Sequence, residues 1–291
     1  MLDKFIEYMK NEGMAQNTYE SYARDVKLFQ KYYEDSYGEE LETLTHSDIS
    51  MYKTYLLNKN MVADTINRKL SSLKKYNQFL IEQNIQEDIV IKEKDFIKIQ
   101  KPMVKKKLPS EKDINRLKHF TSKDEKNPKR DFCFIVLFTY GGFRESELTK
   151  LKVTDIRLED RFINVIGKGN KFRQVVINDL MYGALYDYLK ERREMNIKNP
   201  YLFIGQKNKN TLKPLNRNFC NRQLNKYKEI CKIDGKLYPH ILRDYFCSNA
   251  LHNAGYTIEQ VANQAGHSSL NTTRVYLHTE DEDLLTLSNK L

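Results

Sequence analysis

The stretch IQKPMVKKKLPS at residues 99–110 constrains the fold most, because it separates two differently patterned parts of the chain. It holds two prolines and a run of three lysines, and it lacks the apolar periodicity of a helix or strand. With 291 residues, the chain is long enough for two ordinary domains. We therefore predict a first domain at residues 1–98, a linker at residues 99–109 and a second domain at residues 110–291.

The first part carries an exclusively helical pattern. Apolar side chains recur there at the spacing of one helix face, which predicts helices near residues 3–11, 17–33, 46–58 and 64–83. Asn17 with Glu20 has the spacing of a capping box, and Asp64 or Thr65 could cap the last helix. The first domain is therefore expected to be a small all-helical domain.

The second part is mixed. The apolar run FCFIVLF lies within a predicted buried helix at residues 129–140, and RFINVIGKGNKFRQVVIN at residues 161–178 is typical of a β-hairpin around the turn GKGN. Further helices are expected after the caps Ser110, Asn178 and Thr257, near residues 145–152 and 215–231, and from Pro239 to the stop at Gly255. The fold class is mainly α with a small β-sheet.

The net charge of +10 is unevenly distributed. Residues 1–107 hold 18 Lys+Arg against 17 Asp+Glu, a net charge of +1, so residues 108–291 carry the remaining +9. Such an excess is typical of a protein that binds a polyanion, although lysine-rich surfaces also serve solubility alone. The second domain is therefore the better candidate for contact with nucleic acid.

The composition argues against several other classes. No apolar run reaches the roughly 20 residues of a membrane-spanning helix, and the N-terminal segment has helical periodicity and acids, unlike a signal peptide. The cysteines form neither a CxxC pair nor a zinc-ligand spacing; they are Cys133, Cys220, Cys231 and Cys247. We expect reduced thiols, no metal site and a cytoplasmic, DNA-associated protein.

Several cationic and proton-donating side chains stand where they could converge. His240 and Arg243 are three residues apart and share one helix face. Arg144 follows a Gly-Gly break in an apolar region, where an unpaired guanidinium would be costly. Lys168 lies at the hairpin tip, and His267 and Tyr276 follow a helix stop. Such a set suits a phosphate, because the planar guanidinium can donate to two phosphate oxygens at once.

Four segments in order resemble the motifs of the tyrosine recombinases of the phage integrase family. They are TYGGFRESEL, IGKGNKFR, PHILRDYF and AGHSSLNTTRVYLH, which span residues 139–278. The resemblance implies a helical, SAM-like core-binding domain followed by an α+β catalytic domain. It also implies a compact Xer-like enzyme, with a transposon-encoded cointegrate resolvase as one candidate and chromosome dimer resolution or plasmid integration as others.

The resemblance assigns roles at a scissile DNA phosphate. Arg144 and Arg243 would clamp its non-bridging oxygens, and His267 would hydrogen-bond to it. His240 would orient the phosphate or take the tyrosine proton. No cofactor is implied, since fixed cations can offset the charge that develops in the transition state.

The resemblance also assigns the nucleophile, the proton donor for the leaving group and a supporting carboxylate. Tyr276 would form a 3′-phosphotyrosyl intermediate, Lys168 would protonate the leaving 5′ oxygen, and Glu147 would support the site. A covalent intermediate conserves the energy of the broken bond, so strands can be resealed without ATP. The family commonly has His where this chain has Asp244, and we expect that departure to affect only a supporting role.

The resemblance also implies partners. The enzyme would act as a homotetramer on two DNA duplexes through a Holliday junction, and a C-terminal tail bearing Leu284, Leu285 and Leu287 would pass to a neighbouring subunit or pack on its own domain. Basic side chains outside the catalytic set are candidate phosphate contacts; they are Arg68, Lys69, Lys74, Lys75, Lys105, Lys106, Lys107, Lys171 and Arg173.

Two other functions use similar residues. A type IB topoisomerase would relax supercoils as a monomer on one duplex, and a non-catalytic DNA-binding regulator would retain the fold without forming an adduct. The sequence alone does not reveal the target site or whether insertion or excision is favoured, because a helix face supplies only candidates for base contacts.

Overall fold

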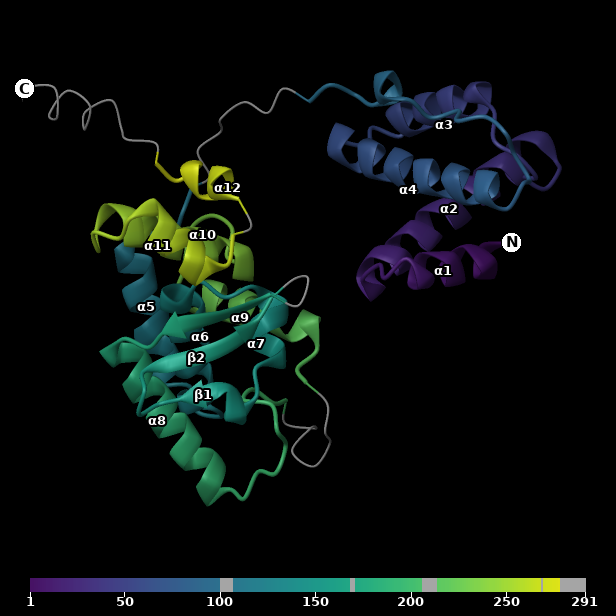
Figure 1. Cartoon of the computed structure of the whole chain (residues 1–291). Helices are drawn as coiled ribbons and strands as arrows, with labels where there is room; N and C mark the ends of the chain where they lie inside the picture. Colours follow the sequence, from purple (N-terminus) through teal and green to yellow (C-terminus); the bar gives the residue numbers. More distant parts are fainter. Residues whose placement is uncertain (100–106, 168–170, 206–213, 268, 278–291) are drawn as a thin grey trace, which may run out of the picture. The chain divides into compact units, whose positions relative to one another are not determined.

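The computed structural model describes residues 1–99, 107–167, 171–205, 214–267 and 269–277 (Figure 1). The chain divides into two compact units, Met1–Val104 and Lys105–Leu291. The first is all-helical within its described residues, and the second combines helices with one small sheet. The fold class predicted from the sequence, mainly α with a small β-sheet, is confirmed.

Four α-helices build the first unit over its described residues, 1–99. They are α1 (Leu2–Asn11), α2 (Gln16–Tyr37), α3 (His46–Asn58) and α4 (Ala63–Glu82), followed by the short 3-10 helix η1 (Glu93–Asp95). Their shared core is rich in aromatic rings, and Phe5 lies edge-on to Tyr76 with ring centroids 5.1 Å apart. The apolar stripes predicted for α2 and α4 are buried, as Phe29 and Leu73 illustrate. The helical periodicity therefore located this core correctly.

The predicted caps of α2 and α4 are wrong. Both helices begin before the polar residue that was expected to cap them, after Ala15 and Val62 in extended conformation, and neither of these residues makes a side-chain cap. Asn17 and Thr65 consequently lie inside the first turn. The start of α3, in contrast, has a complete capping box between Thr45 and Asp48.

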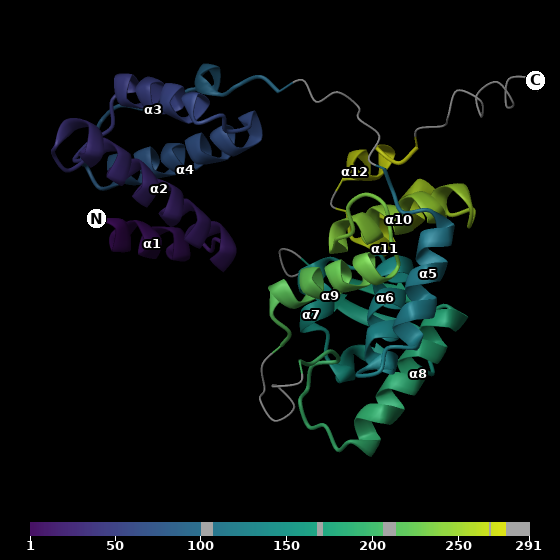
Figure 2. The ribbon, with the colours of Figure 1, turned by 180° about the vertical axis from the view of Figure 1, so that it is seen from behind.

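Helix α6 (Pro128–Gly141) lies at the centre of the second unit. This helix packs against α5 (Glu111–Ser122), α8 (Asp179–Glu194) and α10 (Pro239–His252), as the two opposite views show (Figures 1 and 2). It is buried on nearly every side, as expected for a helix that is apolar all round. The remaining helices are α7 (Glu145–Lys150), α9 (Arg217–Ile230), α11 (Ile258–Ala265) and α12 (Leu270–Arg274), and η2 is a 3-10 turn (Val153–Asp155).

The sheet of the second unit is antiparallel, in the order β1 (Ile156–Arg157), β2 (Phe162–Ile166) and β3 (Phe172–Val176). Ile163 pairs with Val175, and both side chains are fully buried. Alternate residues of β2 therefore face the core, which confirms the predicted hairpin. The caps predicted at Ser110, Asn178 and Thr257 are also present.

The four cysteines are all buried free thiols, in agreement with the sequence-based prediction. Among the helices of the described residues, none combines the length and the apolarity that crossing a lipid bilayer requires.

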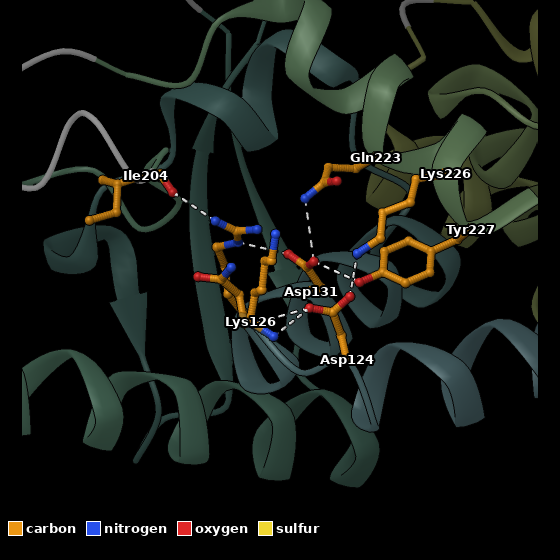
Figure 3. Close-up of polar contacts among 9 residues, drawn as sticks. Asp124, Lys126, Asp131, Ile204, Gln223, Lys226 and Tyr227 are labelled. Atoms are coloured by element: carbon orange, nitrogen blue, oxygen red, sulfur yellow. Dashed lines mark hydrogen bonds and ion pairs between the residues drawn. The ribbon is translucent and has the colours of Figure 1, made fainter. Parts of the chain in front are cut away.

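A buried polar network joins the start of α6 to α9 (Figure 3). Asp131 lies at its centre and is only 2% exposed. Its carboxylate accepts hydrogen bonds from Arg130 Nε and Tyr227 Oη, each at 2.7 Å, and from Gln223 Nε2 at 3.3 Å. Burial, and then the hydrogen bond to Asp131, raise the pKa of the Tyr227 hydroxyl, so that tyrosine stays neutral. The network satisfies groups that would otherwise be costly to bury.

We expect Asp131→Ala to lower the free energy of unfolding of the second unit by about 3 to 5 kcal/mol, because it leaves the buried Arg130 guanidinium without its carboxylate. Urea denaturation of the purified variant measures this loss. Asp179→Ala is the control, because Asp179 forms an exposed ion pair with Arg161 and should cost about 1 kcal/mol or less. Equal losses for the two variants would contradict the prediction.

Candidate active site

Arg243 is a buried cation whose nearest polar partner is a backbone carbonyl. It lies in α10, is 3% exposed, and donates from Nη1 to the Gly142 carbonyl oxygen at 2.6 Å. Within the described part of the chain, no carboxylate lies within ion-pair distance of it. Burial, and then the positive charge of Arg144, lower its pKa to about 10. The side chain is therefore held in place while its charge is only partly offset.

Arg144 lies beside this cation and is more open to solvent. It occupies the N-cap position of α7, and its Nη1 lies 2.8 Å from Glu147 Oε1. Its Nη2 donates to the carbonyl oxygen of Gly266. About a third of its side chain remains exposed. The guanidinium is thus fixed from one side and accessible from the other.

The two glycines that supply these carbonyls have a conformation that other residues rarely adopt. Gly142 ends α6 with φ +64°, and a Cβ atom there would lie 2.6 Å from the ring of Phe246. Gly266 ends α11 with φ +71°, and a Cβ atom there would lie 2.9 Å from Arg173. Glycine is required at both positions, because L side chains disfavour positive φ and because there is no room. The two helix ends therefore aim carbonyl oxygens at the two arginines.

Glu147 links Arg144 to a third arginine. Its carboxylate is 7% exposed and forms a two-pronged pair with Arg173 of β3, at 2.9 Å and 2.8 Å. Arg173 Nε also donates to the carbonyl of Gln264 in α11 at 2.8 Å. Burial alone would raise the pKa of Glu147, but the hydrogen bonds and charges of Arg173 and Arg144 outweigh it and lower the pKa. One carboxylate thus ties α7, β3 and α11 together.

His267 is neutral in this environment. Burial, followed by the charges of Arg243 and Arg144, lowers its pKa to about 4. Its Nδ1 lies 2.7 Å from the hydroxyl oxygen of Thr273, a residue that is completely buried. When the threonine donates this hydrogen bond, the ring proton is on Nε2, the tautomer that can donate to a ligand.

Tyr276 follows α12 and is held at both ends by α10. Its hydroxyl donates to Asp244 Oδ1, and its backbone carbonyl oxygen lies 2.8 Å from Nε2 of His252. The ring packs against the small apolar cluster that contains Phe246 and Val261. Burial, and then the hydrogen bond to Asp244, raise the pKa of the Tyr276 hydroxyl. The phenol is therefore protonated in the resting protein.

Asp244 differs from what the sequence suggested. It was expected to affect only a supporting role, but it is 1% exposed and touches the hydroxyl of Tyr276 directly. His240 lies one turn earlier on α10, with Nδ1 3.3 Å from the same carboxylate oxygen. Neither the contact of Asp244 with the Tyr276 hydroxyl nor that of His252 with the Tyr276 carbonyl was predicted, because both depend on how the residues after α12 pack against α10.

Five of the six predicted catalytic residues converge. The charges of Arg243, Arg144, Asp244 and His240 all act on the pKa of His267, and those of Asp244 and Arg243 act on the pKa of Tyr276. The sixth residue, Lys168, lies outside the described residues. The described cluster combines two guanidinium groups, a neutral imidazole and a half-buried phenol, which suits nucleophilic attack on a phosphate.

Comparison with known proteins agrees with this geometry. Residues 108–283 match the Phage integrase family, and residues 2–84 match the Phage integrase, N-terminal SAM-like domain. The chain belongs to the phage integrase family. It is 36% identical to the TnP I resolvase of Bacillus thuringiensis, over 99% of this chain and 97% of that protein, and 30% identical to tyrosine recombinase XerC of Pediococcus pentosaceus, over 98% and 95%.

A solved structure of the same fold is that of the Tn1549 transposon integrase in complex with transposon right end DNA. It is 19% identical to this chain, covers all of it and 98% of the other chain, and has a TM-score of 0.71. At this identity the likeness concerns the fold. Both units of the phage integrase family protein therefore have counterparts in one solved chain.

The basic residues of α4, which were proposed as DNA contacts, have acidic neighbours in this integrase family member. Lys69 is 5% exposed and pairs with the buried Asp25 at 3.3 Å, so it does not present its ammonium group on the surface as predicted. Arg68 also pairs with Asp25 but remains partly exposed. Lys74 and Lys75 each form an ion pair at 2.7 Å, with Glu93 and Glu12.

The basic residues of the second unit that were proposed as phosphate contacts differ in their exposure to solvent. Lys107 and Lys171 are exposed, although Lys107 pairs with Asp234 at 2.7 Å. The Arg173 side chain is only 10% exposed and its guanidinium is held by Glu147, so it positions the site instead of facing a ligand as predicted. Lys105 and Lys106 lie outside the described residues. The surface lysines remain proposals for phosphate contact.

Glu147→Gln should destabilise the second unit in a pH-dependent way. At neutral pH we expect a loss of about 3 kcal/mol, because two guanidinium groups lose their shared carboxylate. Folding lowers the pKa of Glu147 below its ordinary value of 4.5, so its stabilising contribution is complete above that value and disappears as the pH falls through the folded-state pKa. The difference between wild type and variant should therefore shrink on acidification.

Urea denaturation of both proteins at a series of pH values measures this difference. Asp179→Asn, which changes an exposed carboxylate in the same unit, is the control and should show little difference at any pH. A loss for Glu147→Gln that does not change with pH would contradict the electrostatic explanation.

Proposed function

We propose that this protein is a site-specific DNA recombinase that cuts and rejoins DNA through a 3′-phosphotyrosyl intermediate and a Holliday junction. The observation that carries the proposal is the buried Arg243 beside Arg144: among the described residues Arg243 has no carboxylate within ion-pair distance, and Arg144 shares Glu147 with Arg173. Such a site gains stability by binding an anion. A DNA phosphodiester offers two non-bridging oxygens for the two guanidinium groups.

The phosphate would bind without a change in the protonation of His267. Arg243 and Arg144 are held by the carbonyls of Gly142 and Gly266, so their donors are oriented before DNA arrives. Neutral His267, whose Nδ1 faces the Thr273 hydroxyl, would donate from Nε2 to the phosphate without adding a charge. Such preorganised donors stabilise the charge that builds on the phosphoryl oxygens in the transition state.

Tyr276 would then attack the phosphorus. The new bond joins the phenolic oxygen to phosphorus, and the bond from phosphorus to the 5′ oxygen breaks. Lys168, assigned by resemblance, would give the leaving oxygen its proton. The covalent intermediate conserves the energy of the broken bond, so that a second 5′ hydroxyl can reverse the step on another strand.

The alternatives are not favoured. The curated relatives reported above are a resolvase and a tyrosine recombinase, which favours strand exchange over relaxation of supercoils or non-catalytic binding. The 36% identity to a resolvase over nearly the whole chain supports resolution or integration of a mobile element as the biological role.

Tyr276→Phe tests the chemistry. It removes the nucleophilic oxygen and keeps the ring that packs beside Phe246, so we expect complete loss of covalent protein–DNA adduct with binding unchanged. A nicked suicide substrate, from which the cleaved strand diffuses away, reports the adduct on a denaturing gel, and a mobility shift reports binding. Tyr227→Phe is the matched control, because the Tyr227 hydroxyl of the same unit also donates to an aspartate. An adduct formed by Tyr276→Phe would contradict the assignment.

We further propose that the protein acts as a homotetramer and that residues 281–291 pass to a neighbouring subunit. These residues lie outside the described part of the chain. The last described residues support the idea, since Val275 is 62% exposed and Leu277 is 46% exposed at the point where the tail begins. Apolar side chains in this position are typical of an interface.

Deleting residues 281–291 tests the exchange. We expect single-duplex binding to persist and tetrameric complexes on two duplexes to be lost, because the proposed contact lies between subunits. Light scattering of the protein on a synthetic four-way junction measures the assembly. Tetramer formation equal to that of the full chain would refute the exchange.

A further inference from the structure

Asp244 occupies a position that the proposed mechanism has not yet used. Its carboxylate is 1% exposed and accepts a hydrogen bond from the hydroxyl of Tyr276, the nucleophile proposed above. His240 approaches the same oxygen, Oδ1, at 3.3 Å. The atom that accepts the Tyr276 hydrogen bond is therefore a carboxylate oxygen. His240, which was expected to be a candidate acceptor for the tyrosine proton, contacts that carboxylate instead.

The placement of Asp244 follows from helix geometry. His240 and Asp244 are four residues apart on α10 and so share one face, and His252 lies about two turns further along the same helix. Tyr276 lies along this helix, with His252 at its backbone carbonyl and Asp244 at its hydroxyl. The residue is therefore held at its backbone and at its hydroxyl by one helix, which also carries Arg243. The positions of the nucleophile, its proton acceptor and a phosphate-binding cation are thus all set by helix α10.

We propose that Asp244 accepts the phenolic proton of Tyr276 as the tyrosine oxygen bonds to phosphorus, and returns it when the strand is rejoined. This inference rests on the proposed recombinase function. In the forward step, the O–H electron pair of Tyr276 forms the new bond to phosphorus and the proton goes to Oδ1 of Asp244. The P–O5′ bond electrons stay on the 5′ oxygen, which takes a separate proton from the acid assigned to Lys168.

A carboxylate suits this role because it leaves the nucleophile inactive at rest. Free phenol and carboxylic acid differ by about six pKa units, so the proton stays on Tyr276 until the oxygen begins to bond to phosphorus. The oxygen then becomes far more acidic, and the proton can move along the existing hydrogen bond. A general base in contact with the reacting hydroxyl is typical of such steps.

The other groups around the hydroxyl are poor acceptors. Burial raises the pKa of the neighbouring Cys247 thiol to about 12, so it is protonated. Arg243 is a cation, and His252 contacts the backbone carbonyl of Tyr276. His267 interacts with Thr273 through Nδ1. His240 contacts Asp244 and can stabilise its orientation, which makes it a positioning residue for this step.

The test is the single-turnover rate of adduct formation by Asp244→Asn. The amide keeps the size of the side chain and can still accept a hydrogen bond, but it cannot hold the proton. With suicide DNA that carries an ordinary phosphodiester, we expect a fall of about 100-fold or more, with binding unchanged in a mobility shift. Tyr276→Phe sets the background of the assay.

A second substrate separates the two proton transfers. With a 5′-bridging phosphorothiolate the leaving group is a thiolate, which departs without protonation. Lys168→Ala should therefore regain its rate on the sulfur substrate, whereas Asp244→Asn should remain defective on both. Recovery of Asp244→Asn on the sulfur substrate would overturn the proposal, because it would place Asp244 on the leaving-group side.

Two further variants exclude a structural role. Asp131→Asn is the matched control, a buried carboxylate of the same unit that also accepts from a tyrosine hydroxyl. Its rate per folded molecule should equal that of wild type. Asp244→His restores a proton acceptor at this position and should be faster than Asp244→Asn.

The outcomes are distinct. An Asp244→Asn rate equal to or above that of wild type would overturn the proposal, and a faster rate would show that Asp244 restrains the tyrosine instead. A loss of rate matched by Asp131→Asn, or a rate for Asp244→His no higher than that of Asp244→Asn, would also overturn it. Absence of adduct with the wild-type protein would instead contradict the proposed function itself.

Discussion

The mutual repulsion of two neighbouring guanidinium groups is the interaction on which the rest of this site depends. Burial and the charge of Arg144 lower the pKa of Arg243 to about 10. The protein tolerates this repulsion because carbonyl dipoles from two helix ends and one shared carboxylate, Glu147, partly offset the charge. A bound phosphate would complete the compensation. The repulsion between the arginines destabilises the free protein, and an anion that relieves this repulsion therefore binds more tightly.

The fold brings the compensating groups together from distant segments. Gly142 ends the buried helix α6, Gly266 ends α11, and Glu147 lies one turn into α7. Arg173 of β3 joins the last two by binding both Glu147 and the carbonyl of Gln264. Arg173 pairs with Val165 near the turn end of the β2–β3 hairpin, so this end of the described sheet is anchored to the carboxylate that also orients Arg144.

Local sequence predicted most of the fold and supplied the candidate site residues, whereas the contacts within the site required the structure. Periodicity and caps located α5, α6, α10 and the hairpin, because these signals act over a few residues. The same spacing put His240 and Arg243 on one face. The pairing of Glu147 with Arg173 and the contact of Tyr276 with Asp244 join residues 26 and 32 positions apart. Such contacts depend on packing between elements, which periodicity does not encode.

The position of Asp244 also explains how a positively charged site can keep its nucleophile protonated. The arginines alone would favour phenolate, but burial and Asp244 raise the pKa of Tyr276 above its usual range. The same arginines, together with burial, keep His267 neutral, with a pKa of about 4, so another cation is disfavoured there. In the proposed mechanism the phenolic proton goes to the Asp244 carboxylate on α10, while the leaving oxygen takes its proton from a separate acid, the role proposed for Lys168. Rejoining is the reverse of cleavage, so Asp244 would return its proton to the phenolic oxygen as the strand is resealed.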